Sequence, residues 1–124
     1  MIALDSSSLI AFLCGDAGTD VDAVVNVLRF RQGVLPPVVV VELLSDPAAH
    51  AETAALIKAI PRLDTIDDYW IRAGELRARL LRRGFKARLA DTLIAQSCLD
   101  HDVPLVTRDR DFRIFARHAG LRLA

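Results

Sequence analysis

The amino-acid sequence predicts an α/β protein in which a parallel sheet is covered by helices on both faces, a three-layer α/β/α sandwich. Short apolar runs alternate with segments of helical periodicity, which is typical of parallel sheets with helical crossovers. The chain has 124 residues, enough for one hydrophobic core, and no linker, internal repeat or low-complexity tract divides it. We therefore expect residues 1–124 to form a single domain.

Five short apolar segments are the candidate strands of a central five-stranded parallel sheet. Each is bounded by residues that favour a turn or a helix start. In chain order they are residues 2–5, 34–35, 63–66, 104–107 and 121–123.

Helical patterns fill the intervals between these strands. Residues 38–44 are ambiguous, because four consecutive valines favour a strand whereas Pro36 and Pro37 fit a helix start. We predict a helix there, since a strand ending at Leu35 requires a crossover next. The expected helices are residues 7–13, 20–31, 38–44, 50–60, 67–83, 89–100 and 111–119, the last ending at Gly120.

The composition is that of an ordinary globular protein, with 52% hydrophobic and 26% charged residues. No apolar stretch approaches the length of a membrane span and no secretory signal pattern is present, so we expect a cytoplasmic protein. Cys14 and Cys98 are isolated and lack metal-ligand spacing. Both are expected to be reduced and buried.

A net charge of zero conceals an asymmetry along the chain. Residues 1–71 carry 4 basic and 10 acidic side chains, whereas residues 72–122 carry 12 basic and 6 acidic ones. Such a division suggests a nucleic-acid surface in the basic half. A set of solvated helix faces is the alternative interpretation.

Four carboxylates stand where apolar residues would be expected. Asp5 ends the first strand, Glu42 lies in the valine-rich run, Asp91 interrupts an apolar helix and Asp109 follows the fourth strand. Functional groups of open parallel sheets gather at the carboxyl ends of the strands, so Asp5 and Asp109 would be neighbours if their strands pair. Asp91 occupies the helix that leads into the fourth strand, on the face that carries apolar side chains.

Converging carboxylates repel, and the repulsion has to be relieved. Two of them about 4 Å apart repel by about 4 kcal/mol at an effective dielectric constant near 20. Protonation, pairing with Arg88, Arg108 or Arg110, or binding of a hard cation would relieve it. A small oxygen-seeking ion such as Mg²⁺ or Mn²⁺ fits a cramped strand-end cleft better than a guanidinium. Phosphodiester hydrolysis is the natural reaction for such a site.

Four segments in this order resemble the PIN-domain family, and most closely the VapC-type ribonuclease toxins of prokaryotic toxin–antitoxin pairs. They are Leu-Asp-Ser-Ser at residues 4–7, Val-Glu-Leu at 41–43, Ala-Asp-Thr-Leu-Ile-Ala at 90–95, and Leu-Val-Thr-Arg-Asp-Arg-Asp-Phe at 105–112. The resemblance extends over essentially the whole chain. It implies an α/β/α sandwich with a five-stranded parallel sheet and a Mg²⁺- or Mn²⁺-dependent endoribonuclease that cleaves single-stranded regions of structured RNA.

The resemblance also implies roles for individual residues. Asp5, Glu42, Asp91 and Asp109 would be the catalytic, metal-binding acids, with Asp111 as an additional or water-mediated ligand. The family often has Asn where this chain has Ser7, which puts a direct role of that position in doubt.

Hydroxyl and basic side chains complete the predicted site. The hydroxyls of Ser6 and Thr107 would orient the acids or their bound water, and a basic rim would hold the RNA backbone. The RNA-binding candidates are Arg83, Lys86, Arg88, Arg108 and Arg110.

Partners follow from the resemblance alone: an RNA substrate, a cognate antitoxin that lies across the active cleft, and a second copy of the chain in a homodimer. Tyr69, Trp70 and Phe85 are candidates for exposed interface contacts, with ordinary core packing as the alternative.

Each site residue also has a structural interpretation. Asp5 can cap the first helix, Glu42 can form a buried salt bridge, Asp91 can pair with Arg88, and Asp109 and Asp111 can cap the final helix. Ser6 and Thr107 can serve turns and caps. The alternative for the whole protein is a non-catalytic RNA-binding or assembly module of the same fold.

Overall fold

The computed structural model describes all of residues 1–124 and contains a short parallel sheet surrounded by helices. Three strands, β1 (Ile2–Leu4), β2 (Gly33–Val34) and β3 (Leu105–Val106), run in the order β2-β1-β3. Every connection between them is helical, as parallel pairing requires. The predicted α/β class with a parallel sheet is confirmed.

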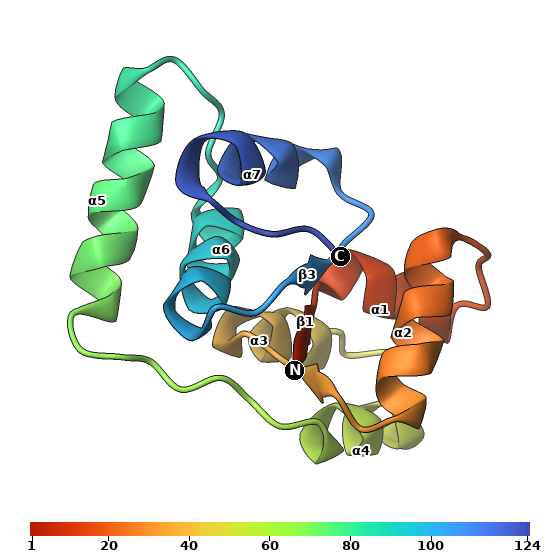
Figure 1. Ribbon diagram of the computed structural model, residues 1–124. Helices are drawn as coiled ribbons and strands as arrows, with labels where there is room; N and C mark the ends of the chain where they lie inside the picture. Colours follow the sequence, from red (N-terminus) through yellow and green to blue (C-terminus); the bar gives the residue numbers. More distant parts are fainter.

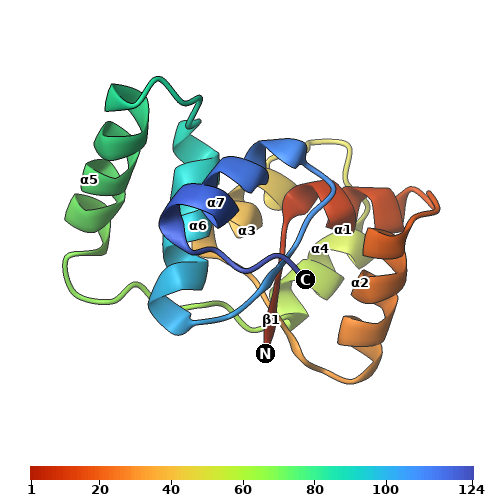
Figure 2. The same cartoon turned by 45° about the horizontal axis from the view of Figure 1, so that its top comes forward.

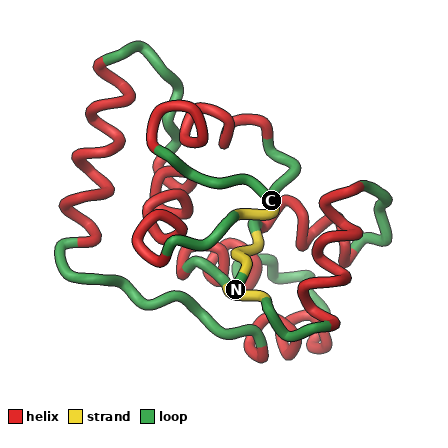
Figure 3. The backbone as a smooth tube through the Cα atoms, viewed as in Figure 1, coloured by secondary structure: helices red, strands yellow, loops and turns green.

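The predicted count of five strands is wrong, because the two outer segments pair through single residues. Leu35 forms one parallel bridge with Arg62, and Leu105 forms one with Leu123. At the first edge the ladder cannot continue, since Pro36 and Pro37 lack the N–H group that the next bond needs. Figure 3 shows how little of the chain is strand, and how a long loop joins α4 (Ala51–Ala59) to α5 (Tyr69–Arg82).

The remaining helices match the predicted intervals closely. They are α1 (Ser6–Leu13), α2 (Thr19–Arg29), α3 (Pro37–Leu44), α6 (Leu89–His101) and α7 (Arg113–Ala119), with a short 3₁₀ helix, η1 (Arg110–Phe112), before α7. Residues 38–44 are helical, as predicted, and Pro37 occupies the first turn of α3. Gly120 ends α7 in the left-handed conformation.

The helices lie on both sides of the strands. In Figures 1 and 2, α2 lies on one side of β1 and β3 and α6 on the other, with α5 outermost against α6. Leu4, Leu35 and Leu105 of the strand region and Phe112 and Phe115 of the C-terminal helices are completely buried. Burial of each such side chain contributes about 1.5–3 kcal/mol, so this core holds the strand ends in register.

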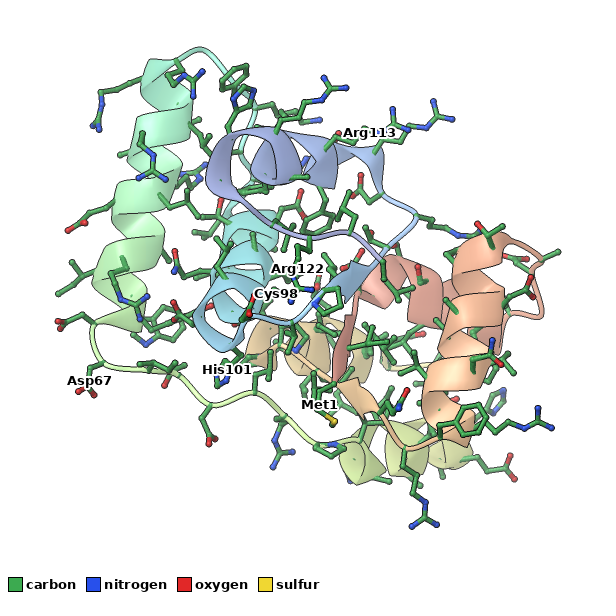
Figure 4. The ribbon with its side chains drawn as sticks, viewed as in Figure 1. Met1, Asp67, Cys98, His101, Arg113 and Arg122 are labelled. Carbon is green, nitrogen blue, oxygen red and sulfur yellow. The ribbon has the colours of Figure 1, made fainter.

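One prediction about individual side chains needs correction, and one open alternative is decided. Cys98 is buried, near the centre of the molecule in Figure 4, but Cys14 is exposed at the end of α1. Of the aromatic candidates for interface contacts, Trp70 is exposed, whereas Tyr69 follows the core-packing alternative: it is buried and donates its hydroxyl to the carbonyl of Leu93. None of the helices is both long enough and apolar enough to cross a membrane.

Candidate metal centre

The site is built on the carboxyl ends of the two central strands. Leu4 pairs with Val106 in the parallel register, so Asp5 and Thr107 are the next residues on adjacent strands. The Asp5 N–H donates to the carbonyl of Val106 at 3.0 Å, which keeps the two chains together at this point. The register therefore places one acid and one hydroxyl side by side, at the edge where sites of this fold class lie.

Asp5 is a buried carboxylate, only 3% exposed, that is held by two hydroxyls. Ser7 Oγ donates to its Oδ2 at 2.6 Å and Thr107 Oγ1 donates to the same oxygen at 2.8 Å. No side-chain bond caps α1, although Asp5 occupies the N-cap position. The capping alternative thus does not account for the side chain, and Oδ1 has no hydrogen-bond donor from the protein.

Three more acids converge beside Asp5. One carboxylate oxygen from each of Asp91, Asp109 and Asp111 lies within 4.8 Å of the other two. Asp109 is fixed by its own N–H, which donates to Thr107 Oγ1 at 3.0 Å. Its Oδ1 accepts the Asp111 N–H at 2.9 Å, so Asp109 caps η1, whereas the structural alternative had it capping the final helix, α7, which has no side-chain cap.

Asp91 is the least compensated acid of this group. It shares a helical face with the buried Ala95 and Cys98, as predicted, and no hydrogen bond or salt bridge of the protein reaches it. Burial, followed by the charges of the neighbouring carboxylates, raises the pKa of Asp91 from 3.8 to about 6, while Arg88 opposes the rise. The neighbours that raise it are Asp109, Asp5 and Asp111.

Burial and charge also act on Cys98, two helical turns further along α6. Burial, with the charge of Asp5, raises the pKa of the Cys98 thiol to about 12. This thiol is therefore an inert core group rather than a metal ligand.

Glu42 lies at the margin of the site. Its Oε1 accepts a hydrogen bond from Ser6 Oγ at 3.2 Å, and Glu42 is exposed on α3 without any salt bridge. Desolvation raises the pKa of Glu42, the Ser6 hydroxyl lowers it, and the charge of Asp5 raises it. Glu42 is thus electrostatically joined to Asp5 but is not part of the close trio, and the buried salt bridge considered for it is absent.

The donor set fits a hard divalent cation. Asp5, Asp91, Asp109 and Asp111 present carboxylate oxygens, the ligands that Mg²⁺ and Mn²⁺ prefer, and no thiol or imidazole belongs to the trio. A cation among them would also compensate the charge of Asp91, which no protein group pairs.

The basic candidates divide into two groups. Lys86 Nζ lies 3.4 Å from Asp111 Oδ2 and Arg88 Nε lies 3.9 Å from the same atom, so both stand at the rim of the acids. Arg88 therefore contacts Asp111, and the pairing with Asp91 that was considered as the structural alternative is not formed. Arg83 lies over the Phe85 ring, 5.0 Å from its centre.

The remaining two basic candidates differ from each other. Arg110 is exposed at the start of η1. The Arg108 side chain instead turns away and binds Asp20 on α2. Figure 4 shows Arg113, at the start of α7, on the outside of the molecule.

Sequence reasoning missed Ser7 and Asp20. Ser7 was doubted because the family often has Asn at its position, yet its short hydroxyl reaches Asp5 from the first turn of α1. Asp20 has the sequence signature of an ordinary first-turn helix acid, so nothing in the local pattern points to the distant Arg108.

Comparison with known proteins agrees with this architecture. The chain aligns with the crystal structure of VapBC2 from Rickettsia felis bound to a DNA fragment, at a TM-score of 0.74 and 20% identity, covering 100% of this chain and 98% of that one. FitAcB from Neisseria gonorrhoeae aligns at a TM-score of 0.71 and 19% identity, covering 99% and 96%. VapBC-5 from Mycobacterium tuberculosis, of the VapBC family of toxin-antitoxin systems, aligns at 0.65 and 22%, covering 98% and 95%.

At these identities the likeness establishes the fold. A comparison with curated protein sequences gave no match. The family model described as the PIN domain matches residues 2–118, nearly the whole chain. The chain therefore belongs to the PIN domain family.

Proposed function

We propose that this chain is a Mg²⁺- or Mn²⁺-dependent endoribonuclease that hydrolyses RNA phosphodiester bonds, and that it is the VapC-type toxin of a type II toxin–antitoxin pair. One observation carries the proposal: Asp91 is a partly buried acid without any protein partner, and it faces Asp109 and Asp111 beside Asp5. A fold does not require such an arrangement, whereas a catalytic cation site does.

The proposed roles follow from the contacts. Asp5, Asp91 and Asp109 would hold the cation, Asp111 would assist, and Glu42 would act from the margin of the site. When bound, a divalent cation lowers the pKa of a coordinated water and stabilises charge on a phosphate oxygen.

The surrounding side chains orient these acids and the substrate. Thr107 donates to Asp5 and accepts from the Asp109 N–H, so a single hydroxyl fixes two of the acids. The Ser6 hydroxyl donates one hydrogen bond to Glu42 and orients that acid. Lys86 and Arg88, at the rim, would contact RNA phosphates, and Arg83 and Arg110 would extend this basic surface.

The structural neighbours include toxin–antitoxin complexes, which supports a protein partner for this chain. A cleft of about 370 Å³ adjoins Glu42 and is walled by apolar side chains of α1 and α3, including Ile10, Leu13 and Leu43. We propose that the antitoxin occupies this cleft, beside Glu42 at the margin of the acid site. The indole of Trp70, 67% exposed, is our candidate contact in a homodimer.

Cleavage of RNA by the purified protein tests the catalytic proposal. Labelled structured RNA with single-stranded loops is incubated with Mg²⁺, with Mn²⁺ and with a chelator, and cleavage is expected only with the metals. Asp91→Asn should abolish cleavage, whereas Asp64→Asn, a matched change of an exposed acid outside the site, should leave it unchanged.

Two results would contradict the proposal. Cleavage that persists in Asp91→Asn would remove this acid from the catalytic site. RNA binding without metal-dependent cleavage would favour the non-catalytic module instead.

A further inference from the structure

Arg108 stands between Thr107 and Asp109, but its side chain does not face the acids. It extends to the start of α2, where Nε donates to Asp20 Oδ2 at 2.8 Å and Nη2 donates to Oδ1 at 3.1 Å. Nη2 also donates to the carbonyl of Ala17 at 3.2 Å. This two-pronged geometry is the strongest form of a guanidinium–carboxylate contact.

The backbone of the same residue is attached to α1. The Arg108 N–H donates to Ser7 Oγ at 3.3 Å, and Ser7 Oγ donates onward to Asp5. Arg108 therefore connects the segment that carries Thr107 and Asp109 to two helices. Its backbone N–H binds Ser7 on α1, and its side chain binds Asp20 on α2.

Gly18 indicates that the chain is built around this contact. A Cβ at this position would lie 2.5 Å from Asp20 Oδ1 and 3.0 Å from Arg108 Nη2, and the residue has φ +154°. A side chain at residue 18 would therefore displace the carboxylate and guanidinium of this pair, and it would strain the backbone at this positive φ. The absence of a side chain at Gly18 leaves room for the ion pair beside the start of α2.

The carboxylate of the pair is largely buried, whereas the Arg108 side chain is 36% exposed. The Asp20 side chain is only 14% exposed, and the Arg108 hydrogen bonds hold the pKa of Asp20 down at about 2. Because the Arg108 guanidinium donates to Asp20, these donors are not available to bind an RNA phosphate.

From these contacts we infer that the Arg108–Asp20 pair is a positioning device, which holds residues 107–111 so that Thr107 and Asp109 keep their places at the acid site. The inference rests on the proposed function and assigns Arg108 and Asp20 to positioning rather than to RNA binding. Asp20 acts through Arg108 and touches neither RNA nor cation.

The test compares Asp20→Asn with Asp22→Asn, a change of an exposed acid in the same helical turn that forms no ion pair. Hydrogen exchange of the Asp109 and Asp111 amides is measured in metal-free protein, since these amides report the local bonds to Thr107 and Asp109. Asp20→Asn should speed their exchange about tenfold or more, as loss of a charged hydrogen bond implies. Asp22→Asn should leave it unchanged.

Binding of Mn²⁺, followed by electron paramagnetic resonance, provides the second measurement. Asp20→Asn should weaken Mn²⁺ binding about 3- to 10-fold. This loss is no larger than the smallest loss expected on removing a residue that hydrogen-bonds a metal ligand directly, about tenfold, because Asp20 acts through Arg108. Asp20→Glu, which keeps the charge, should recover part of this loss. Unchanged exchange and unchanged Mn²⁺ affinity in Asp20→Asn would overturn the inference, and so would exchange that is faster throughout β1 and α6 as well.

RNA binding separates positioning from phosphate contact. Asp20→Asn removes the main partner of Arg108 and leaves it only the 3.9 Å contact with Asp16 and the carbonyl of Ala17, so a phosphate-contact role predicts tighter RNA binding and undiminished cleavage. The positioning role predicts a lower kcat with little change in KM. If the wild-type protein neither cleaves RNA nor binds Mn²⁺, the proposed function fails, while the exchange measurement still decides whether the pair orders residues 107–111.

Discussion

The substitution Asp91→Asn should stabilise the metal-free protein at neutral pH while removing its response to metal. The change keeps the shape of the side chain and deletes a charge that the folded protein accommodates poorly. Burial and three neighbouring carboxylates raise the pKa of Asp91 from 3.8 to about 6, and no protein donor compensates them. The free-energy cost of this charge is therefore part of the cost of folding the metal-free chain.

The sign of the pH dependence follows from the raised pKa. Below about pH 4 Asp91 is protonated in the folded and unfolded states alike, so it costs nothing. Between about pH 4 and pH 6 only the folded state retains the proton, and stability falls as the pH rises. Above pH 6 the cost is complete, at about 3 kcal/mol for a rise from 3.8 to about 6. Partial exposure to solvent screens the charge and reduces the expected cost to about 1–2 kcal/mol.

Thermal unfolding with a chelator at pH 7.5 and at pH 4 measures this effect. Asp91→Asn should raise Tm by about 3–8 °C at pH 7.5 and by nothing at pH 4. Saturating Mn²⁺ should stabilise the wild type, by about 2.7 kcal/mol at 100 times Kd, and should leave the variant unchanged. Asp64→Asn controls for the loss of an acid elsewhere. A variant no more stable than the wild type at pH 7.5, or equally stabilised by Mn²⁺, would refute the reasoning.

Three further variants test the surroundings of the acids and the core. Ser7→Ala should weaken Mn²⁺ binding about tenfold, measured by paramagnetic resonance, because a direct donor to Asp5 is lost; unchanged affinity would exclude the role. Changing Arg83, Lys86 and Arg88 together to Gln should weaken RNA binding. The slope of the logarithm of the binding constant against the logarithm of the salt concentration should become shallower by about 2–3. An unchanged slope would show that these residues do not contact RNA phosphates. Phe115→Ala should destabilise the fold by about 3–5 kcal/mol in urea unfolding, since the ring is completely buried.

The apolar pattern of the sequence predicts which segments can form strands, but the length of each strand depends on whether its neighbour can continue the backbone pairing. Apolar runs at residues 63–66 and 121–123 have the composition of strands, but the structure has only single bridges there, one at Arg62 just before the first run and one at Leu123 in the second. The composition of a run cannot reveal that the neighbouring segment lacks the N–H groups needed for further pairing. Pro36 and Pro37 carry that information, because the residues that start α3 also end the ladder at Leu35.

The acids were predictable because each contradicts its own surroundings. Asp5 and Asp91 stand in apolar segments, and such a conflict between local pattern and residue type marks functional positions. Arg108 illustrates the opposite case. Beside an acid in a basic half of the chain it matched a phosphate contact, whereas its partner Asp20 lies 88 residues away in sequence and carries no distinguishing feature.

The contrast between Asp5 and Asp91 gives the strongest argument for a cation. Asp5 receives two hydroxyl donors on one oxygen and is compensated by the protein. Asp91 receives none, and the nearest guanidinium, that of Arg88, contacts Asp111 instead. Protonation does not solve the problem either, because a group with a pKa of about 6 is about ten parts ionised to one part neutral at pH 7. Of the three ways to relieve the repulsion, the chain itself supplies neither a proton nor a partner at neutral pH. A divalent cation held by Asp91, Asp109 and the free oxygen of Asp5 would supply the missing charge.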